Sequence, residues 1–437
     1  MQDLIEKVKN KASAGELFKV NYRTVPVEYE MNQLKSINME ETEGWALRVI
    51  HDGKIGFSSS TSQDQIDGMI NKSLEVAQFG QEAKFDFPDK IPSTGKQKIK
   101  LYDDSVREKS VEEMIAAGDE IVKQVLSINA GLRCDAGVTK QDGEIQYGNT
   151  RGASFSYKNT GLSYSIMVQD TRENDMMMLM ESMQWGNTDF SLDDLWERLE
   201  RKIKWSEKVV DASSGSMPVI FSPKALLVLI LPFISGLNGR MVNKKISPLQ
   251  DKKDTAVSSP LFSLYSDGTI DYAGGSAPYD DEGIPMQRLP LIEKGILKNY
   301  YYDLQNAGEA GVKTTGNGIR HGFHASPSPG VANLIVPEGK TSFDDMIKDI
   351  KEGIIVDQVL GLGQGNVLSG AFSNNVQLGF KIKNGKIAGR IKNVMIAGNA
   401  FEVLKDVAAV GDKARWISGQ YFFPYIYIKS LSVSTKS

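Results

Sequence analysis

Cysteine and histidine are both scarce in this chain. Its 437 residues include a single cysteine, Cys134, and three histidines, His51, His321 and His324. One cysteine excludes an intramolecular disulfide framework and is typical of a reducing compartment. Because Cys134 lies in an alternating, strand-like segment, we expect it to be a buried structural thiol.

Long apolar runs are also missing. The most apolar stretch, residues 225–234, predicts a helix over 225–231 and is interrupted by Pro232. It is too short to cross a bilayer, because a spanning helix needs about 20 apolar residues. The first residues are polar with a helical pattern, and they lack the apolar core of a signal peptide. We therefore expect a soluble, cytoplasmic protein that does not associate with a membrane.

Neither sign of charge dominates. The chain has 51 Lys and Arg residues against 55 Asp and Glu residues, which gives a net charge of −4. Without a basic excess or a basic arm, the chain has no bulk electrostatic attraction for nucleic acid. Apolar residues make up 41% and charged residues 24%, as in ordinary globular proteins, so disordered, collagen-like and coiled-coil classes are excluded.

The apolar periodicity predicts an α+β fold. Asp52-Gly53 between two alternating runs predicts a hairpin, Ser110 begins a capping-box helix, and residues 133–168 alternate as an antiparallel meander. Polar segments at 80–95 and 211–216 mark boundaries. We predict mixed α/β N-terminal units with antiparallel strands, followed by a large, mainly antiparallel β domain with a few helices. The predicted domains are an N-terminal α+β unit at 1–95, a middle α+β unit at 96–210 and a C-terminal β-rich domain at 211–437.

His321 and His324 form a first candidate site. Two imidazoles separated by two residues can share a metal when the backbone bends suitably. Here Ser-Pro-Ser-Pro follows at 326–329 instead of a helix, and no cysteine is near. We interpret the histidines as a loop pair that makes hydrogen bonds, with metal binding as the minor alternative.

The acidic run Asp280-Asp281-Glu282 is a second candidate site. Its composition is that of a cation site or of a general acid/base pair. Because Gly283 follows directly, the favoured interpretation is a solvated acidic turn that ends in glycine.

Two further motifs are weaker candidates for a functional site. The glycine-rich run at 361–365 lacks the strand, helix and Lys-Ser/Thr ending that a phosphate-binding loop needs. The methionines at 176–178, 180 and 183 could be a soft-metal box. We interpret them instead as flexible core filler or as an adaptable surface.

Four groups of residues, spread over nearly the whole chain, resemble the TldD/PmbA family. Members of this family are labelled modulators of DNA gyrase and are grouped as metallopeptidases. The matching stretches are residues 44–50 with 56–59, 280–284 with 293–297, 313–317, and 380–387 with 396–399. The Asp-Asp-Glu-Gly and Ile-Ala-Gly-Asn pieces resemble the PmbA branch, also called TldE, more closely than the TldD branch.

The resemblance also identifies a metal motif that this chain lacks. In TldD-type subunits a helix carries His-Glu-x-x-x-His before a Gly-x-x-Gly, and a late cysteine completes the metal site. The matching Gly-x-x-Gly is at 236–239, so Ile230, Leu231 and Ser235 stand where His, Glu and His would be. An apolar Ile-Leu pair cannot hold a divalent ion.

This conclusion does not depend on the alignment. No histidine occurs between His51 and His321, and no cysteine follows Cys134. The resemblance therefore implies a subunit with no catalytic residue, no metal and no cofactor of its own, and its enzymatic status stays open.

The leading hypothesis is a PmbA/TldE-type subunit that pairs with a TldD-type metallopeptidase subunit, or associates with itself as a dimer. Resemblance implies that such a complex cleaves unfolded or extended peptides, which an exposed strand edge of the C-terminal domain would hold by main-chain pairing. The alternatives are a stand-alone homo-oligomeric peptide-binding protein, a gyrase modulator or DNA-associated protein, and an independent hydrolase that uses Ser, Cys or the pair His321 and His324.

Overall fold

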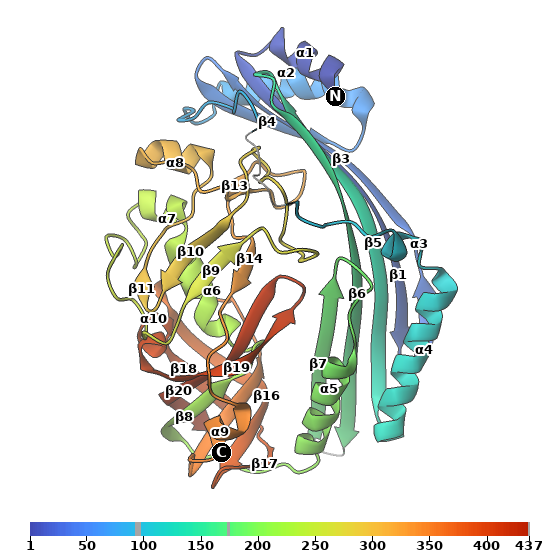
Figure 1. The fold of residues 1–437 in the computed structure, drawn as a ribbon, viewed down its shortest axis with the longest axis vertical. Coiled ribbons are helices and arrows are strands. Elements are labelled where there is room, and N and C mark those ends of the chain that lie inside the picture. Colours follow the sequence, from blue (N-terminus) through green and yellow to red (C-terminus); the bar gives the residue numbers. More distant parts are fainter. Residues whose placement is uncertain (92–97, 173–174, 436–437) are drawn as a thin grey trace.

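Alternating apolar and polar side chains in the N-terminal half build one long, curved antiparallel sheet, shown by the computed structural model in Figure 1. The structure describes residues 1–91, 98–172 and 175–435. The strand order is β4-β3-β1-β5-β6-β7, with β2 beside the end of β1. The strands are β1 (Ala14–Glu30), β2 (Gln33–Ile37), β3 (Glu40–His51), β4 (Lys54–Ser60), β5 (Arg133–Asn149), β6 (Ser154–Arg172) and β7 (Asp175–Trp185).

The predicted first and middle units contribute strands to this same sheet. Strand β1 pairs with β3 on one side and with β5 on the other. The predicted boundary between residues 95 and 96 lies outside the described residues. The division into three domains therefore stays a prediction.

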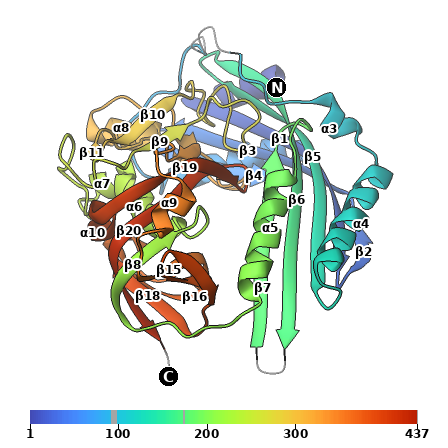
Figure 2. The same cartoon turned by 60° about the horizontal axis from the view of Figure 1, so that its bottom comes forward.

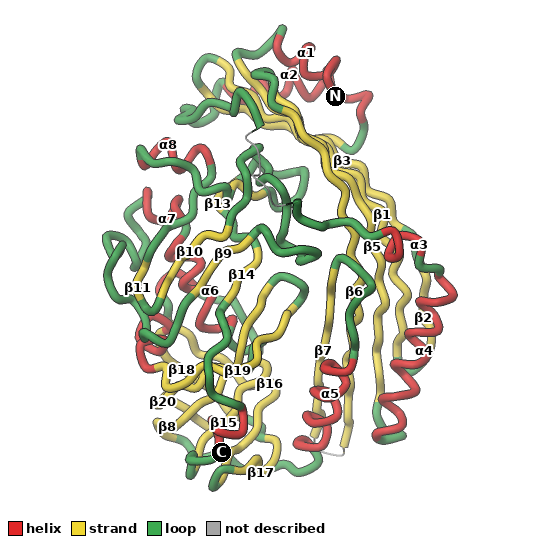
Figure 3. Tube along the Cα trace, viewed as in Figure 1, coloured by secondary structure: helices red, strands yellow, loops and turns green. Residues whose placement is uncertain are grey.

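Helices α1, α2 and α4 cover the outer face of the sheet, away from the C-terminal lobe (Figure 3). Helices α1 and α2 cover one end, where their apolar side chains pack against Trp45 and Leu47. Helix α4 covers the other end, and its predicted capping box at Ser110 is confirmed. The helices are α1 (Gln2–Lys9), α2 (Ile66–Ala77), α3 (Asp104–Glu108), α4 (Val111–Ile128) and α5 (Asp193–Ser206), and the short 3-10 helix η1 spans Gln63–Gln65.

A second, mainly antiparallel sheet forms the C-terminal lobe. Strands β8, β20, β18, β16 and β15 pair in a closed ring, and β14, β9, β10 and β11 extend the sheet from β20. The lobe strands are β8 (Gly215–Phe221), β9 (Leu264–Asp267), β10 (Arg288–Glu293), β11 (Ile296–Leu297), β14 (Asn333–Ile335), β15 (Glu352–Val359), β16 (Ala371–Lys383), β17 (Lys386–Arg390), β18 (Val394–Asn399), β19 (Val407–Ile417) and β20 (Tyr421–Thr435). The small pair β12 (Gly318–Ile319) and β13 (Ser328–Pro329) stands apart. This architecture, with 23% helix and 42% strand, confirms the predicted α+β class.

The helices of the lobe are short apart from α6. The apolar run predicted as a helix over 225–231 forms α6 (Leu227–Leu237), which continues through Pro232 instead of ending there. The continuation follows from packing, because the helix is embedded in the apolar core of the lobe. No helix within the described ranges is long and apolar enough to cross a membrane. The other helices are α7 (Gly239–Asn243), α8 (Leu304–Ala310), α9 (Phe343–Ile347) and α10 (Ala400–Val403), with the 3-10 turns η2 (Val367–Ser369) and η3 (Leu404–Asp406).

The sheet and the lobe share an apolar core through α5. This helix lies between β6, β7 and the lobe (Figure 2). Its Leu195 and Leu199 belong to a cluster that includes Cys134 of the sheet and Phe380 of the lobe. Cys134 is fully buried, as predicted. At the other end of the junction, the Phe323 ring of the lobe packs directly over the sheet.

We expect Gly44→Ala to destabilise this junction. A Cβ atom at position 44 would lie 2.3 Å from the Phe323 ring, and overpacking of this kind costs about 1–3 kcal/mol. Urea unfolding would measure the loss. The matched control is Gly68→Ala in α2, where an added Cβ meets no atom within 4 Å. This control should gain up to about 1 kcal/mol, because Ala favours helix. Equal effects of the two substitutions would contradict the expectation.

Candidate functional site

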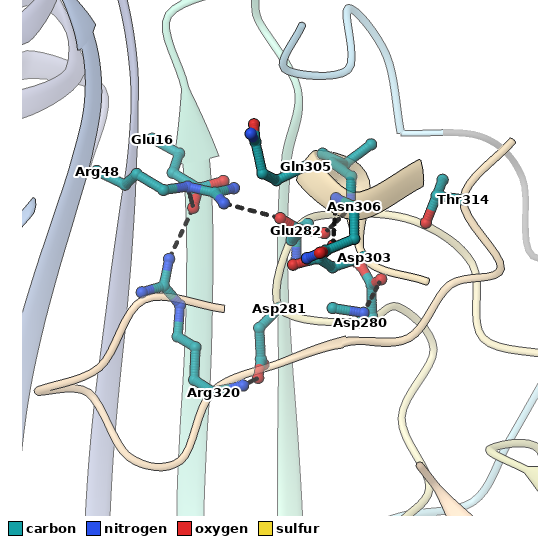
Figure 4. A network of polar contacts seen from close by, with 12 residues as sticks. Glu16, Arg48, Asp280, Asp281, Glu282, Asp303, Gln305, Asn306, Thr314 and Arg320 are labelled. Atoms are coloured by element: carbon teal, nitrogen blue, oxygen red, sulfur yellow. Dashed lines mark hydrogen bonds and ion pairs between the residues drawn. The ribbon is translucent and has the colours of Figure 1, made fainter. Parts of the chain in front are cut away.

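A buried arginine and a buried glutamate on neighbouring strands form the centre of the first site. Glu16 on β1 and Arg48 on β3 are register partners, and both point from the sheet toward the lobe (Figure 4). Their side chains are 0% and 2% exposed, and Arg48 Nε lies 2.8 Å from Glu16 Oε1. Arg48 Nη1 donates to Glu282 Oε1 of the lobe at 2.8 Å. This guanidinium therefore joins the sheet to the lobe.

A second arginine reaches the same carboxylate from the lobe. Arg320, which follows β12, donates through Nη2 to Glu16 Oε1 at 2.7 Å. From the sheet, the Tyr147 hydroxyl donates to Glu16 Oε2 at 3.1 Å. Both oxygens of Glu16 thus have partners, which offsets the cost of burying its charge.

The acidic segment at 280–282 is buried, so the predicted solvated turn is wrong. Asp280 and Glu282 are 1% and 0% exposed. The Asp280 carboxylate accepts hydrogen bonds from the backbone N–H groups of Glu282, Ile284 and Gly318 at 3.1, 2.9 and 2.9 Å. The turn chemistry was identified correctly, but the side chains are covered by segments distant in sequence.

Burial also raises the pKa of these carboxyl groups. Burial raises the pKa of Glu282 to about 7, with Arg48 opposing the shift and Asp303 adding to it. Burial likewise raises the pKa of Asp281 to about 6. The pKa of Asp280 is well above its usual value because of burial and the nearby charge of Glu282. The segment therefore holds protons near neutral pH, which is a property of an acid/base group.

The structure brings the histidine loop close to this segment. The backbone N–H of Arg320 donates to Asp281 Oδ2 at 2.7 Å. His321 and His324 nevertheless lie exposed between β12 and β13, where His324 packs edge-on against Phe323. In the part of the chain that the structure describes, no three His, Cys, Asp or Glu side chains come together as metal ligands.

A second buried ionic network lies farther along the sheet. Glu181 on β7 is 2.7 Å from Lys202 and 3.3 Å from Arg198, both on α5. Lys202 also reaches Asp357 on β15 at 2.7 Å, and Lys224, just before α6, lies 3.2 Å from Glu181. Burial alone would raise the pKa of Glu181, but these cations hold it well below its usual range.

A cavity of about 650 Å³ opens beside this network, between the sheet and the lobe, and is named the inter-lobe cavity. Its sheet wall contains Met167 and Met180, which are register partners on β6 and β7. Its lobe wall contains Leu227, Leu362 and Lys224. The cavity is therefore mainly apolar, and the charged residues in its lining include Lys224 and Lys35.

The methionine run at 176–183 lies within β7 itself. Met176 and Met180 are 58% and 47% exposed, whereas Met177 is buried on the opposite face. The run thus provides both core filler and an adaptable surface, the two predicted roles.

The three positions that the resemblance assigned to the metal motif lie on α6, and one of them, Leu231, lines a cavity. Ile230 is fully buried in the apolar core. Leu231 lines a second cavity of about 570 Å³, the helix cavity, between α6 and the loop at 360–366. Ser235 is partly buried. Leu362 lines both cavities, so the two adjoin at this helix.

Apart from the acidic run at 280–282, the charged residues of both networks were not predicted from the sequence. Glu16, Arg48, Glu181 and Asp357 all stand in strongly apolar strand segments. An ionisable residue facing inward from such a strand requires a buried partner, and this signal could have identified them. The partner itself was not readable, because Arg48 and Glu282 are 234 positions apart.

Two family models match the chain. The model described as the PmbA/TldA metallopeptidase C-terminal domain matches residues 214–435. The model described as PmbA/TldA metallopeptidase domain 1 matches residues 15–77. Together they cover the C-terminal lobe and the first strands of the sheet.

Several characterised and uncharacterised proteins are similar in sequence. An uncharacterised protein of Methanocaldococcus jannaschii is 27% identical over 94% of this chain and 95% of its own length. A "Metalloprotease TldD homolog" of Haemophilus influenzae is 36% identical, over 47% of this chain and 42% of its own length. "Metalloprotease PmbA" of Escherichia coli O157:H7 is 21% identical over 93% of this chain and 89% of its own length.

Solved structures share the fold. TldE from Thermococcus kodakarensis superposes with a TM-score of 0.90 at 20% identity, over 99% of both chains. A protein of Thermotoga maritima described as a modulator of DNA gyrase superposes with a TM-score of 0.88 at 21% identity, over 99% of this chain and 100% of its own.

We expect the free energy of unfolding to decrease as the pH rises from about 5 to 8. The folded-state pKa of Glu282, about 7, exceeds the value of about 4.3 for an unfolded chain, so the folded protein retains a proton that the unfolded chain has lost. The contribution totals on the order of 3 kcal/mol. Urea unfolding across this pH range should therefore give a flatter profile for Glu282→Gln than for the native chain.

The control for this measurement is Glu402→Gln, at a side chain that is 70% exposed. It should keep the pH profile of the native chain. Parallel profiles for the native chain and Glu282→Gln would show that Glu282 does not titrate in this range.

Proposed function

Because the chain belongs to the PmbA/TldD metallopeptidase family, we propose that it is a PmbA/TldE-type subunit that works with a TldD-type metallopeptidase subunit. In this proposal the partner holds the catalytic metal, and this chain supports the cleavage of extended peptides in the cytoplasm.

The proposal rests on which metal-ligating side chains α6 offers. A catalytic divalent metal needs about three nitrogen, sulfur or carboxylate ligands and an open position. Ile230 and Leu231 offer no such ligand, and Ser235 offers only a hydroxyl group. The residues present therefore do not fit the metal that the family name implies.

The cavities beside α6 support a role in peptide handling. The inter-lobe cavity and the helix cavity meet at Leu362, next to the helix where the family carries its catalytic motif. By contrast, the outer edge of β19, a candidate for strand pairing with a peptide, is partly occupied: Thr341 and Gly339 make backbone hydrogen bonds to Val410, Gly411 and Asp412. We therefore place the extended peptide in the cavities instead of on that edge.

The alternatives have weaker support. A stand-alone, self-associating peptide-binding protein would use the same cavities and differs only in its partner. DNA binding is disfavoured because the net charge is −4, so the chain has no excess of basic residues to attract the phosphate backbone. An independent hydrolase that bound a metal through His321 and His324 would need a third ligand, and these exposed histidines have none among the described residues.

The test combines the chain with a TldD-type subunit from the same genome. We expect one complex by size-exclusion chromatography with light scattering, and faster or altered cleavage of an unfolded peptide compared with the TldD-type subunit alone. The isolated chain should retain no stoichiometric zinc after dialysis and should cleave nothing.

The double variant His321→Ala/His324→Ala provides the control and should behave as the native chain does in each assay. Persistent separation of the two subunits at micromolar concentration would favour the stand-alone binding protein. Equimolar zinc in the isolated chain, lost together with peptidase activity in the double variant, would favour the independent hydrolase.

A further inference from the structure

Lys224 holds an unusual position at the wall of the inter-lobe cavity. Its side chain is 19% exposed and lies 3.2 Å from Glu181 Oε1. It also donates to the backbone carbonyl of Met180 on β7. An ammonium group has three N–H donors, so one donor is available to a molecule in the cavity.

The network behind Lys224 carries an excess of positive charge. Glu181 is shared among three cations, while Asp357 serves one of them. With Asp194 and Arg415, which continue the network from Arg198, four cations face three carboxylates. The cations are Arg198, Lys202, Lys224 and Arg415, and the carboxylates are Glu181, Asp194 and Asp357. Burial lowers the pKa of Lys224, and an anion beside it would stabilise its charged form.

The opposite end of the cavity is acidic. Glu28, Glu30 and Asp135, from β1 and β5, line it there, together with Lys35 of β2, which pairs with Glu30, so three carboxylates face one cation. Strand order places β1 and β5 away from β7, where Glu181 and Lys224 meet. The cavity therefore has positive charge at one end and negative charge at the other, which complements a peptide that ends in a carboxylate.

The wall between these ends can adapt to different side chains. Met167 and Met180 on the sheet face Leu227 and Leu362 of the lobe across the cavity. Methionine is unbranched and polarisable, so it packs against varied apolar groups. Leu362 is 40% exposed, and it also lines the helix cavity.

We propose that the inter-lobe cavity binds an extended peptide and that Lys224 receives a carboxylate of that peptide. The carboxylate is either the peptide's C-terminus or an Asp or Glu side chain, and apolar side chains of the peptide lie against the methionine wall. This inference rests on the proposed role in peptide handling and adds the chemical group that is recognised.

The experiment measures fluorescence anisotropy of three labelled, unstructured peptides of leucine, alanine and serine. One has a free C-terminal carboxylate, one has a C-terminal amide, and one has a C-terminal amide after a glutamate. The full chain should bind the first peptide at least about tenfold more tightly than the second, as expected for a hydrogen bond to a charged group. The third peptide shows whether a side-chain carboxylate substitutes for the terminus.

Variants test whether the preference for a peptide carboxylate arises in the inter-lobe cavity. Lys224→Met should abolish the difference between acid and amide peptides. Leu362→Glu adds a negative charge at a partly exposed cavity position without altering the buried network, and should weaken the acid peptide about tenfold or more. The matched control is Leu261→Glu, at a side chain that is 57% exposed and lines neither the inter-lobe cavity nor the helix cavity. It should leave the affinity unchanged.

The outcomes separate this inference from the proposed function. If the affinity is the same with and without a peptide carboxylate, and does not change in Lys224→Met or Leu362→Glu, the inference is wrong. The peptide-handling role is unaffected by that result. Equal weakening by Leu362→Glu and Leu261→Glu also overturns the inference, because the charge effect would then not belong to this cavity. If no peptide binds to the native chain, and the TldD-type subunit cleaves equally well without it, both proposals fail.

Discussion

The junction between the sheet and the lobe depends on the ion pairs of the buried Arg48 guanidinium. This guanidinium is paired with Glu16 of its own sheet and with Glu282 of the lobe, both at 2.8 Å. Buried charges cost several kcal/mol each unless they are paired. The carboxylate of Glu282 therefore gains its main cationic partner only when the lobe lies against the sheet, and this requirement favours the observed arrangement over other packings of the same apolar faces.

Two ionic networks hold the junction at different places, and the inter-lobe cavity adjoins one of them. The first network joins β1 and β3 to the acidic segment of the lobe, and the second joins β7 and α5 to β15 and the start of α6. Ionic contacts are directional and fix the distance between the walls. The methionine and leucine side chains between them are adaptable. A cavity with fixed walls and an adaptable lining suits the proposed handling of peptides of different sequence.

Local patterns in the sequence predicted the elements well. The hairpin at Asp52-Gly53 is present, with φ values of 50° and 74° that only a few residue types adopt easily. The meander over 133–168 is present as β5 and β6. The two errors have one cause: the acidic segment at 280–282 is buried, and α6 continues through Pro232, because packing by distant segments overrides the local preference.

The sequence by itself determined which elements form and which residue types α6 can offer, since periodicity, caps and turns act between neighbours in the chain. The sequence likewise identifies Ile230, Leu231 and Ser235 as the residues at the positions that the resemblance assigns to the metal motif. Only the tertiary structure decided that Arg48 meets Glu282 and that Lys224 faces a cavity. Such contacts join segments far apart in the chain. The alternation of a strand predicts that a side chain points inward, but it does not predict which residue that side chain contacts.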